Sequence, residues 1–244
     1  MLTVITGGTR GIGAATAHRL AADGHDLVLG YASDDDAAES TARAVREHAD
    51  VNLVRADLTT DAGVDLLFGR AAELGTVTGL VNNAGATLGI GPLAEASTAV
   101  VRRTVDLNLT AAILCARAAV RLMSTGRGGS GGVVVNVSSG AATLGAPHEY
   151  VQYAAAKAGL DALTTGLAVE VAGEGIRVVG VAPGIVRTTI HADAGEPGRV
   201  DRVGPLVPLG RVGEPAEVAD AIGWLMSDQA SYVTGTTLRV AGGR

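Results

Sequence analysis

A glycine-rich turn joins a short apolar run to a helical segment at the start of the chain. Leu2–Thr6 has the composition of a buried strand, and Gly11–Gly24 has the residue spacing of a helix. Between them the chain reads G-x-x-x-G-x-G, through Gly7, Gly11 and Gly13. Such a cluster alone is compatible with a tight turn. Placed between a strand and a helix, it lets the backbone approach a pyrophosphate at the free N–H groups of the helix N-terminus, so it predicts a nucleotide site.

The rest of the sequence alternates strand-like and helical segments. This alternation predicts an α/β fold in which a parallel, doubly wound sheet carries helices on both faces. We see no internal boundary or repeat, so residues 1–244 are expected to form a single domain. The further expected strands are Asp26–Tyr31, Val51–Arg55, one ending at Leu80–Asn82, Val133–Val137, Ile176–Val181 and Thr236–Val240. The expected helices are a polar one ending near His48, about 60–74, roughly 97–124, Tyr150–Ala172 and Glu214–Ser227.

One long segment, about 184–213, shows neither periodicity. It contains Pro197, Pro205 and Pro208. An irregular stretch of this length in a compact domain is usually a functional loop, so we predict a substrate lid there.

The composition agrees with a buried parallel sheet. Hydrophobic residues make up 47% of the 244 residues, but aromatic ones only 2%. The core must therefore be built from Val, Leu, Ile and Ala, which suits strands that are covered on both faces. The 35 glycines are too many for a plain helical bundle.

Charge and cysteine content exclude several classes of protein. The net charge is −6, and the lysines and arginines are scattered rather than clustered, which argues against a nucleic-acid partner. Cys115 is the only cysteine, so no intrachain disulfide is possible, and its apolar neighbours indicate a small core residue. We find no apolar run long enough to cross a membrane, no signal peptide and no metal-binding pattern. The expectation is a soluble cytoplasmic protein without a membrane partner or a metal.

The end of the second strand is where such a fold selects its cofactor. A carboxylate there would bind the 2′-hydroxyl of NAD, but the chain has Tyr31, Ala32 and Ser33. Arg10, in the glycine-rich turn, is placed to pair with a 2′-phosphate. We therefore favour NADP(H) over NAD(H). The acidic run 34–36 opposes a phosphate, and we interpret it as the cap and first turn of the next helix.

Polar and small residues follow the third and fourth strands. Asp57 and Leu58 are candidates for contact with the adenine. Asn83, Ala84 and Gly85 leave room for the adenosine half of the cofactor. Asn82, just before them, has the alternative role of tying neighbouring strands together.

Tyr153 and Lys157 are a candidate proton-transfer pair. Four residues on a helix place both side chains on one face. An ammonium beside a phenol favours the phenolate and so lowers the pKa of the tyrosine. Such a tyrosine serves as a proton donor and acceptor near neutral pH.

With these motifs in this order, the chain resembles the short-chain dehydrogenase/reductase family over nearly its whole length. Its 3-oxoacyl-(acyl carrier protein) reductase-like and glucose dehydrogenase-like members are the most similar. The resemblance implies a single Rossmann-like domain with a seven-stranded parallel sheet and a nicotinamide cofactor. It also implies a Ser-Tyr-Lys centre extended by an asparagine. The motifs are Thr6–Gly13 (with Thr9 and Ile12), Asp57, Asn82–Gly85, Asn108, Ser138-Ser139, Tyr153 with Lys157, and Pro183-Gly184.

The resemblance also implies a role for each matched residue. Tyr153 would be the acid in carbonyl reduction and the base in alcohol oxidation. Lys157 would hold the nicotinamide ribose hydroxyls, and Asn108 would help hold a water in a proton relay. Pro183 and Gly184 would approach the nicotinamide, with Val186 and Thr188 near its carboxamide.

Two serines compete for the place beside the substrate oxygen. Strand alternation points Ser138 and Ser139 to opposite sides. The family usually places its serine one residue closer to the tyrosine than Ser139 is. We prefer Ser139, with one residue inserted before Tyr153.

The predicted reaction is the NADPH-dependent reduction of a ketone or aldehyde to an alcohol. The loop 141–150 and the lid would select a small or medium polar carbonyl compound.

The alternatives are an NAD-dependent alcohol or sugar dehydrogenase running oxidatively, a non-enzymatic dinucleotide sensor, and an epimerase or dehydratase. The resemblance implies a homotetramer or homodimer. The candidate substrate-loop residues are His148, Glu149, Tyr150, His191, Glu196, Arg199 and Arg202.

Overall fold

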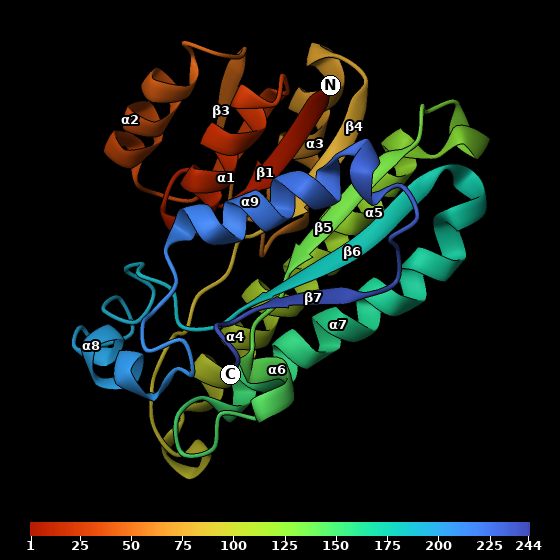
Figure 1. The fold of residues 1–244 in the computed structure, drawn as a ribbon. Coiled ribbons are helices and arrows are strands. Elements are labelled where there is room, and N and C mark those ends of the chain that lie inside the picture. The colour runs from red at the N-terminus through yellow and green to blue at the C-terminus, as the bar shows by residue number, and fades with distance from the viewer.

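A seven-stranded parallel sheet forms the centre of the computed structural model, which describes all residues 1–244. The strands lie in the order β3-β2-β1-β4-β5-β6-β7 (Figure 1). The predicted fold class is therefore confirmed. The strands are β1 Leu2–Thr6, β2 Asp26–Tyr31, β3 Val51–Arg55, β4 Val77–Asn82, β5 Gly132–Val137, β6 Ile176–Pro183 and β7 Thr237–Val240.

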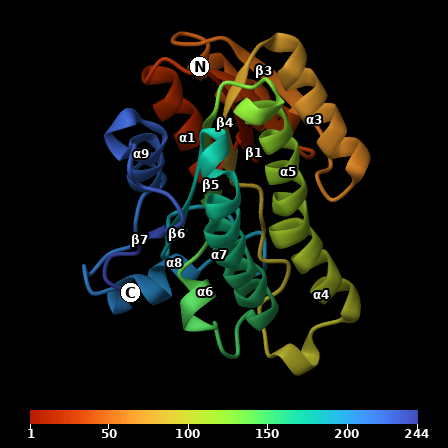
Figure 2. The same ribbon diagram turned by 90° about the vertical axis from the view of Figure 1, so that its right-hand side faces the viewer.

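Helices cover both faces of the sheet. Figure 2 shows α1 and α9 on one side, and α3, α5 and α7 on the other. The helices are α1 Gly11–Ala22, α2 Asp35–Val45, α3 Asp61–Leu74, α4 Thr98–Val105, α5 Ala111–Met123, α6 Ala141–Leu144, α7 Val151–Val171, α8 Arg199–Val203 and α9 Pro215–Met226.

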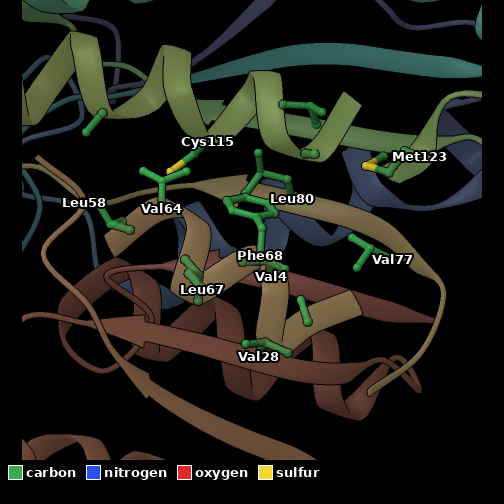
Figure 3. Close-up of a cluster of buried hydrophobic side chains, with 14 of the residues drawn as sticks. Val4, Val28, Leu58, Val64, Leu67, Phe68, Val77, Leu80, Cys115 and Met123 are labelled. Atoms are coloured by element: carbon green, nitrogen blue, oxygen red, sulfur yellow. The ribbon is translucent and has the colours of Figure 1, made fainter. Parts of the chain in front are cut away.

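Alternating side chains of each strand supply two separate cores. Val4 and Val28 face α3 and α5, where they pack with Phe68 (Figure 3). Ile5 and Leu29 point to the opposite face and pack with α1 and α9. This period of two is what a strand buried on both faces requires. Cys115 lies in the first core at 1% exposure, as predicted, and burial raises the pKa of its thiol to about 12.

The sheet reverses its winding between β1 and β4. β1 pairs with β2 on one side and with β4 on the other. In open α/β sheets, ligands bind outside the carboxyl ends of the strands at such a switch point. The glycine-rich turn follows β1 directly, so the fold places it at that edge.

Three segments differ from the prediction. The expected helix over 97–124 is interrupted by a π-helical turn at Asp106–Thr110, where Asn108 bonds to a neighbouring strand end. The lid 184–213 is not wholly irregular, because it contains α8 and a short 3-10 turn at Gly204–Leu206. The loop 141–150 begins with the single-turn helix α6. No helix of the protein is both long and apolar enough to cross a membrane.

Two glycines of α3 should respond oppositely to alanine. A Cβ on Gly63 would lie 2.0 Å from the carbonyl oxygen of Asp57, whereas a Cβ on Gly69 meets nothing within 4 Å. We expect Gly69→Ala to stabilise the protein by about 0.5–1 kcal/mol, because alanine loses less backbone entropy in a helix. Gly63→Ala should destabilise it by at least about 1–3 kcal/mol through the clash. Chemical denaturation of both variants tests this, and equal effects would contradict it.

Candidate active site

A cavity of about 680 Å³ opens at the carboxyl ends of the strands, beneath the lid. Its wall combines residues from the glycine-rich turn, the ends of β2 to β6, helix α7 and the lid. All but two of the predicted cofactor and catalytic residues line it; the exceptions are Gly13 and Asn108. The predicted residues in the wall are Gly7, Thr9, Arg10, Gly11, Ile12, Tyr31, Ser33, Asp57, Leu58, Asn83, Ala84, Gly85, Ser139, Tyr153, Lys157, Pro183, Gly184, Val186 and Thr188.

The glycine-rich turn needs its glycines for two different reasons. Gly7 and Gly11 have φ angles of +61° and +52°, which side-chain-bearing residues rarely adopt. A Cβ on Gly13 would lie 2.0 Å from the carbonyl oxygen of Gly7. Gly13 therefore lets α1 pack against the turn and does not line the cavity, whereas Gly7 and Gly11 do.

The end of β4 holds the glycine-rich turn in place. The side-chain amide of Asn83 donates to the carbonyl oxygens of Thr6 and Gly7, at 3.0 and 2.9 Å. The hydroxyl of Thr6 accepts from the backbone N–H groups of Asn83 and Ala84. Asn82 donates to the side-chain oxygen of Asn136 on β5, 3.0 Å away, so its interpretation as a strand tie is confirmed.

The tip of β2 carries no carboxylate of its own, but acidic groups lie close to it. The Tyr31 hydroxyl donates to Asp35 at 2.9 Å. Asp34 accepts from the backbone N–H of Ala37 and so caps α2, as predicted. Asp34 also lines the cavity, which was not predicted. The exposed Arg10 lies 3.9 Å from Asp34 and 3.8 Å from Asp193 of the lid.

Asp57 shapes the turn that follows β3. Its carboxylate accepts from the backbone N–H and the hydroxyl of Thr59, at 3.0 and 2.7 Å. These bonds hold the pKa of Asp57 below its usual value. Leu58 beside it is buried and presents an apolar surface to the cavity.

Tyr153, Lys157 and Ser139 come together at the other end of the cavity. Tyr153 and Lys157 lie on one face of α7, at 7% and 3% exposure, with Nζ 5.7 Å from the centre of the tyrosine ring. Ser139 follows β5, and its hydroxyl is near enough to that of Tyr153 to lower the pKa of the phenol. Lys157 donates to the carbonyl oxygen of Val137 at 2.8 Å. The three side chains therefore lie together, Tyr153 and Lys157 buried and Ser139 half-buried.

Burial dominates the ionisation of this cluster. It raises the pKa of Tyr153, and the hydrogen bond from Ser139 only partly opposes that shift. Burial also lowers the pKa of Lys157 to about 8. The expectation that Lys157 makes Tyr153 more acidic is thus wrong for this structure. A low-dielectric surrounding favours the neutral form of both groups, and it is the largest cause of both shifts.

The two serines have separate environments. Ser138 is buried, and its hydroxyl donates to the carbonyl oxygen of Lys157 at 3.3 Å. The hydroxyl of Ser139 accepts from the backbone N–H of Ala141 at 3.1 Å, and its proximity lowers the pKa of Tyr153. Of the two serines, Ser139 is thus the one in contact with the tyrosine.

Asn108 lies behind the cavity wall. Its amide donates to the carbonyl oxygens of Ala86 and Thr104, both at 2.9 Å, and its oxygen accepts from the N–H of Ala86. A Cβ on Gly85 would lie 2.6 Å from the Asn108 oxygen and 3.3 Å from Lys157 Nζ. Asn108 therefore fixes the backbone after β4, and Gly85 permits its approach to the lysine.

Comparison with known proteins identifies the family of this chain. A family model described as enoyl-(acyl carrier protein) reductase matches residues 7–244. The Escherichia coli protein named uncharacterized oxidoreductase YgfF is 43% identical over 245 residues, covering 100% of this chain and 99% of its own. The chain belongs to the short-chain dehydrogenase/reductase family. It is therefore an oxidoreductase of the kind that uses NAD(P) and acts on alcohol or carbonyl groups.

Two further short-chain dehydrogenase/reductases illustrate the range of relatives. The 3beta-hydroxysteroid dehydrogenase 1 of Eggerthella lenta is 41% identical over 243 residues, which is 98% of this chain and 92% of the relative. The crystal structure of levodione reductase is 32% identical and superimposes with a TM-score of 0.91, over 99% of this chain and 96% of that one.

The loop 141–150 and the lid, which were predicted to select the substrate, line the other end of the cavity of this short-chain dehydrogenase/reductase, here called the substrate end. Tyr150 and Glu149 line the cavity, but His148 is exposed and does not, because its left-handed φ of 62° belongs to a turn on the surface. His191 and Arg199 line it from the lid, whereas Glu196 and Arg202 lie outside. Sequence reasoning missed the apolar contacts that irregular segments contribute, namely Leu107, Leu144, Ala146, Pro147, Ile185 and Ile190.

His191 is a buried histidine of this substrate end. It is 8% exposed, and its Nδ1 atom has no hydrogen-bond partner. Burial and the charge of Arg199 lower the pKa of His191 to about 4, so the imidazole is neutral near pH 7.

The lid reaches back to the nucleotide end. A Cβ on Gly11 would lie 3.2 Å from the Thr188 methyl group, so the lid touches the glycine-rich turn. Gly184 donates its N–H to the carbonyl oxygen of Val240, and Pro183 accepts from the N–H of Gly140. These bonds hold the start of the lid beside the Ser139 loop.

The residues present fit a dinucleotide. A Cβ on Gly7 would lie 3.1 Å from Ala84 and from the Asn83 amide nitrogen, and a Cβ on Gly11 would lie 3.2 Å from the Thr188 methyl group. Glycine at both positions therefore keeps the backbone of the turn bare where it borders the cavity. A free helix N-terminus follows at α1, whose Arg10 cap makes no side-chain bond. No group of three or more His, Cys, Asp and Glu side chains has the arrangement of a metal site.

Proposed function

We propose that this short-chain dehydrogenase/reductase reduces a ketone or aldehyde to an alcohol with NADPH, and that Tyr153 donates the proton. The observation that carries the proposal is the Ser139–Tyr153–Lys157 cluster in the same cavity that the glycine-rich turn opens into. When bound, the nicotinamide supplies the hydride to the carbonyl carbon.

Tyr153 is protonated at neutral pH, so its hydroxyl can donate a hydrogen bond to a carbonyl oxygen and has a proton to transfer. Burial raises its pKa, which makes it a weaker acid than a free tyrosine, so the support for its role is its place in the cavity beside Ser139 and Lys157. Ser139 would donate a second hydrogen bond to the same oxygen as negative charge develops there. Lys157, whose pKa is near 8, would be largely protonated at pH 7 and would favour the tyrosinate that forms.

The remaining residues would hold the cofactor. The turn residues Gly7, Thr9, Gly11 and Ile12 would contact the pyrophosphate through their backbone. Lys157 would bind the nicotinamide ribose, and Asn108 would keep its surroundings fixed through Ala86. The groups proposed for the adenosine half are Tyr31, Ser33, Asp57, Leu58, Asn83, Ala84 and Gly85, and those for the nicotinamide are Pro183, Gly184, Val186 and Thr188.

NADP(H) is our preferred cofactor, on the strength of Arg10. Its guanidinium is half exposed at the cavity edge, beside the open tip of β2. Two carboxylates near Arg10 oppose a phosphate, Asp34 at 3.9 Å and Asp193 at 3.8 Å. The capping bond of Asp34 to Ala37 directs the first of them to the helix.

Arg10→Ala tests the cofactor preference. We expect the Kd for NADPH to rise by about tenfold, because a charge-assisted bond contributes about 1.5–3 kcal/mol. The Kd for NADH should change less than about twofold, since NADH offers no 2′-phosphate to lose; each Kd is read from cofactor fluorescence. Arg187→Ala, a half-exposed arginine paired with Glu214 and absent from the cavity wall, is the matched control. Equal losses for both cofactors would contradict the preference.

The names of the relatives favour a secondary alcohol or ketone as substrate. One relative is named 3beta-hydroxysteroid dehydrogenase and another, 42% identical, cis-4-hydroxycyclohexanecarboxylate dehydrogenase. The apolar residues of the lid and loop, such as Ile185 and Ile190, suit a compound with a hydrocarbon body. We therefore infer a less polar substrate than sequence reasoning suggested.

Two other functions can be distinguished from the proposed NADPH-dependent reduction by experiment. A non-enzymatic sensor would bind the cofactor but turn nothing over, and the complete Ser139, Tyr153 and Lys157 set argues against it. An NAD-dependent alcohol dehydrogenase would prefer NADH in the Arg10 comparison. We further propose that residues 1–244 act as one catalytic domain, in a cytoplasmic homotetramer or homodimer.

A further inference from the structure

Arg199 carries a buried charge at the substrate end of the cavity. It begins helix α8 in the lid, and its side chain is only 2% exposed. A buried guanidinium must be paired, and two carboxylates pair it. Glu149 accepts at 2.5 and 3.0 Å in a two-pronged bond, and Glu196 accepts at 2.8 Å. The Arg199 guanidinium is therefore paired with carboxylates of the protein itself, one of them in the loop 141–150.

The same guanidinium contacts Tyr150. Its Nη2 donates to the Tyr150 hydroxyl at 2.9 Å, and its central carbon lies 5.0 Å from the ring centre of that tyrosine. A cation over an aromatic face is attracted by the ring. The Tyr150 ring in turn meets the Tyr153 ring at 5.5 Å and 87°, an edge-to-face contact. A continuous path of contacts therefore runs from Arg199 in the lid to Tyr153.

The loop that carries Glu149 and Tyr150 needs such support. Ala146 and His148 have φ angles of +45° and +62°, in the left-handed region that costs side-chain-bearing residues free energy. The N–H of Gly91 donates to the carbonyl oxygen of Glu149 at 2.6 Å, and Arg199 binds its carboxylate. The lid therefore helps hold a strained loop next to Tyr153.

We propose that Arg199 is a positioning residue that fastens the lid to Glu149 and Tyr150, and thereby sets the Tyr153 ring against the substrate carbonyl. The proposal rests on the proposed function, in which Tyr153 is the proton donor. Misplacement of a reacting group by about 1 Å can cost a hundredfold in rate. Loss of Arg199 should therefore slow the chemical step without removing a contact to the cofactor.

The test compares Arg199→Met with Arg202→Met in the full-length enzyme. Arg202 lies on the same helix and contacts the same two carboxylates, but it is 54% exposed, lies outside the cavity wall and does not contact Tyr150. We expect Arg199→Met to lower kcat by at least about tenfold. The Kd for NADPH should stay within about twofold, and Arg202→Met should change kcat less than about twofold, as for most surface ion pairs.

An isotope effect separates positioning from a structural role. With NADPH deuterated at the transferred position, Arg199→Met should show a larger kinetic isotope effect than the wild type, because the chemical step becomes rate-limiting. If circular dichroism shows that the methionine variant does not fold, Arg199→Lys replaces it, since lysine keeps the charge but not the paired bonds. Wild-type kcat and isotope effect in the folded variant, a change confined to KM, or an equal loss in Arg202→Met would each overturn the proposal.

Tyr153→Phe is measured in parallel to keep the two proposals apart. Turnover retained by Tyr153→Phe would contradict the proposed function, whatever Arg199 does. Turnover lost in Tyr153→Phe but unchanged in Arg199→Met would contradict only the role of Arg199.

Discussion

Tyr153→Phe is expected to lower kcat by at least about a hundredfold, because a positioned general acid contributes roughly 10²–10⁴-fold. Phenylalanine keeps the buried ring and its edge-to-face contact with Tyr150, so packing is preserved. Only the hydroxyl is lost, together with its bond to Ser139. The rate is measured as NADPH oxidation with an accepted ketone.

Cofactor binding and folding serve as the controls for Tyr153→Phe. The Kd for NADPH should change by no more than about tenfold, since a single neutral hydrogen bond contributes about 0.5–1.5 kcal/mol. Tyr150→Phe is the matched variant, because Tyr150 lies one turn earlier, lines the same cavity and bonds Arg199. It should lose less activity than Tyr153→Phe. If the order were reversed, the proton donor would have to be reassigned to Tyr150.

Gly13→Ala should abolish tight cofactor binding. The added Cβ would lie 2.0 Å from the Gly7 carbonyl oxygen and 2.6 Å from the Asn83 amide nitrogen. Both groups are backbone or fixed by hydrogen bonds, so the turn must move. We expect the Kd for NADPH to rise by at least about tenfold, together with a loss of about 1–3 kcal/mol in stability from overpacking. Cofactor fluorescence and urea denaturation measure the two effects.

Gly8→Ala provides a graded comparison within the same turn. Its Cβ would meet the end of the Leu29 side chain at 2.9 Å and the Ile5 carbonyl oxygen at 3.1 Å, and its φ is not in the left-handed region. A flexible side chain can shift and a carbonyl oxygen at 3.1 Å clashes less than one at 2.0 Å, so this variant should bind NADPH more tightly than Gly13→Ala. Wild-type affinity in Gly13→Ala would refute the packing role of that glycine.

The fold could be predicted because strands and turns carry strong local signals. β1, β2 and β3 have the predicted bounds, since valine, isoleucine and leucine runs end at glycine or polar residues. The π-helical turn at Asp106–Thr110 was not predictable, because it depends on the bonds of Asn108 to Thr104 and to Ala86, which lies far away in sequence. Tertiary contacts of this kind leave no local pattern.

The nucleotide end was predicted more completely than the substrate end. Glycine spacing and strand ends identify the former, so Gly7, Gly11 and Asn83 were found from sequence. The substrate end is built by irregular segments whose path depends on the whole fold. The hydrogen bond from Arg199 to Tyr150 joins residues that are 49 apart in the sequence, so no pattern of residue spacing could predict it.

Ionisation of Tyr153 and Lys157 was the least predictable property. The spacing of the two residues suggested a more acidic phenol, whereas burial gives the opposite direction. Burial of α7 on the sheet is a global outcome, so its effect on a pKa cannot be read from a four-residue spacing.

The most direct test of the account follows the transferred hydrogen. The enzyme is incubated with NADPH deuterated at the transferred position and with a panel of cyclic and open-chain ketones, and the products are analysed by mass spectrometry. The account predicts an alcohol with one deuterium on the former carbonyl carbon. It also predicts that this product is nearly absent with Tyr153→Phe. Tight NADPH binding without deuterium in any product would contradict it and would favour a dinucleotide sensor.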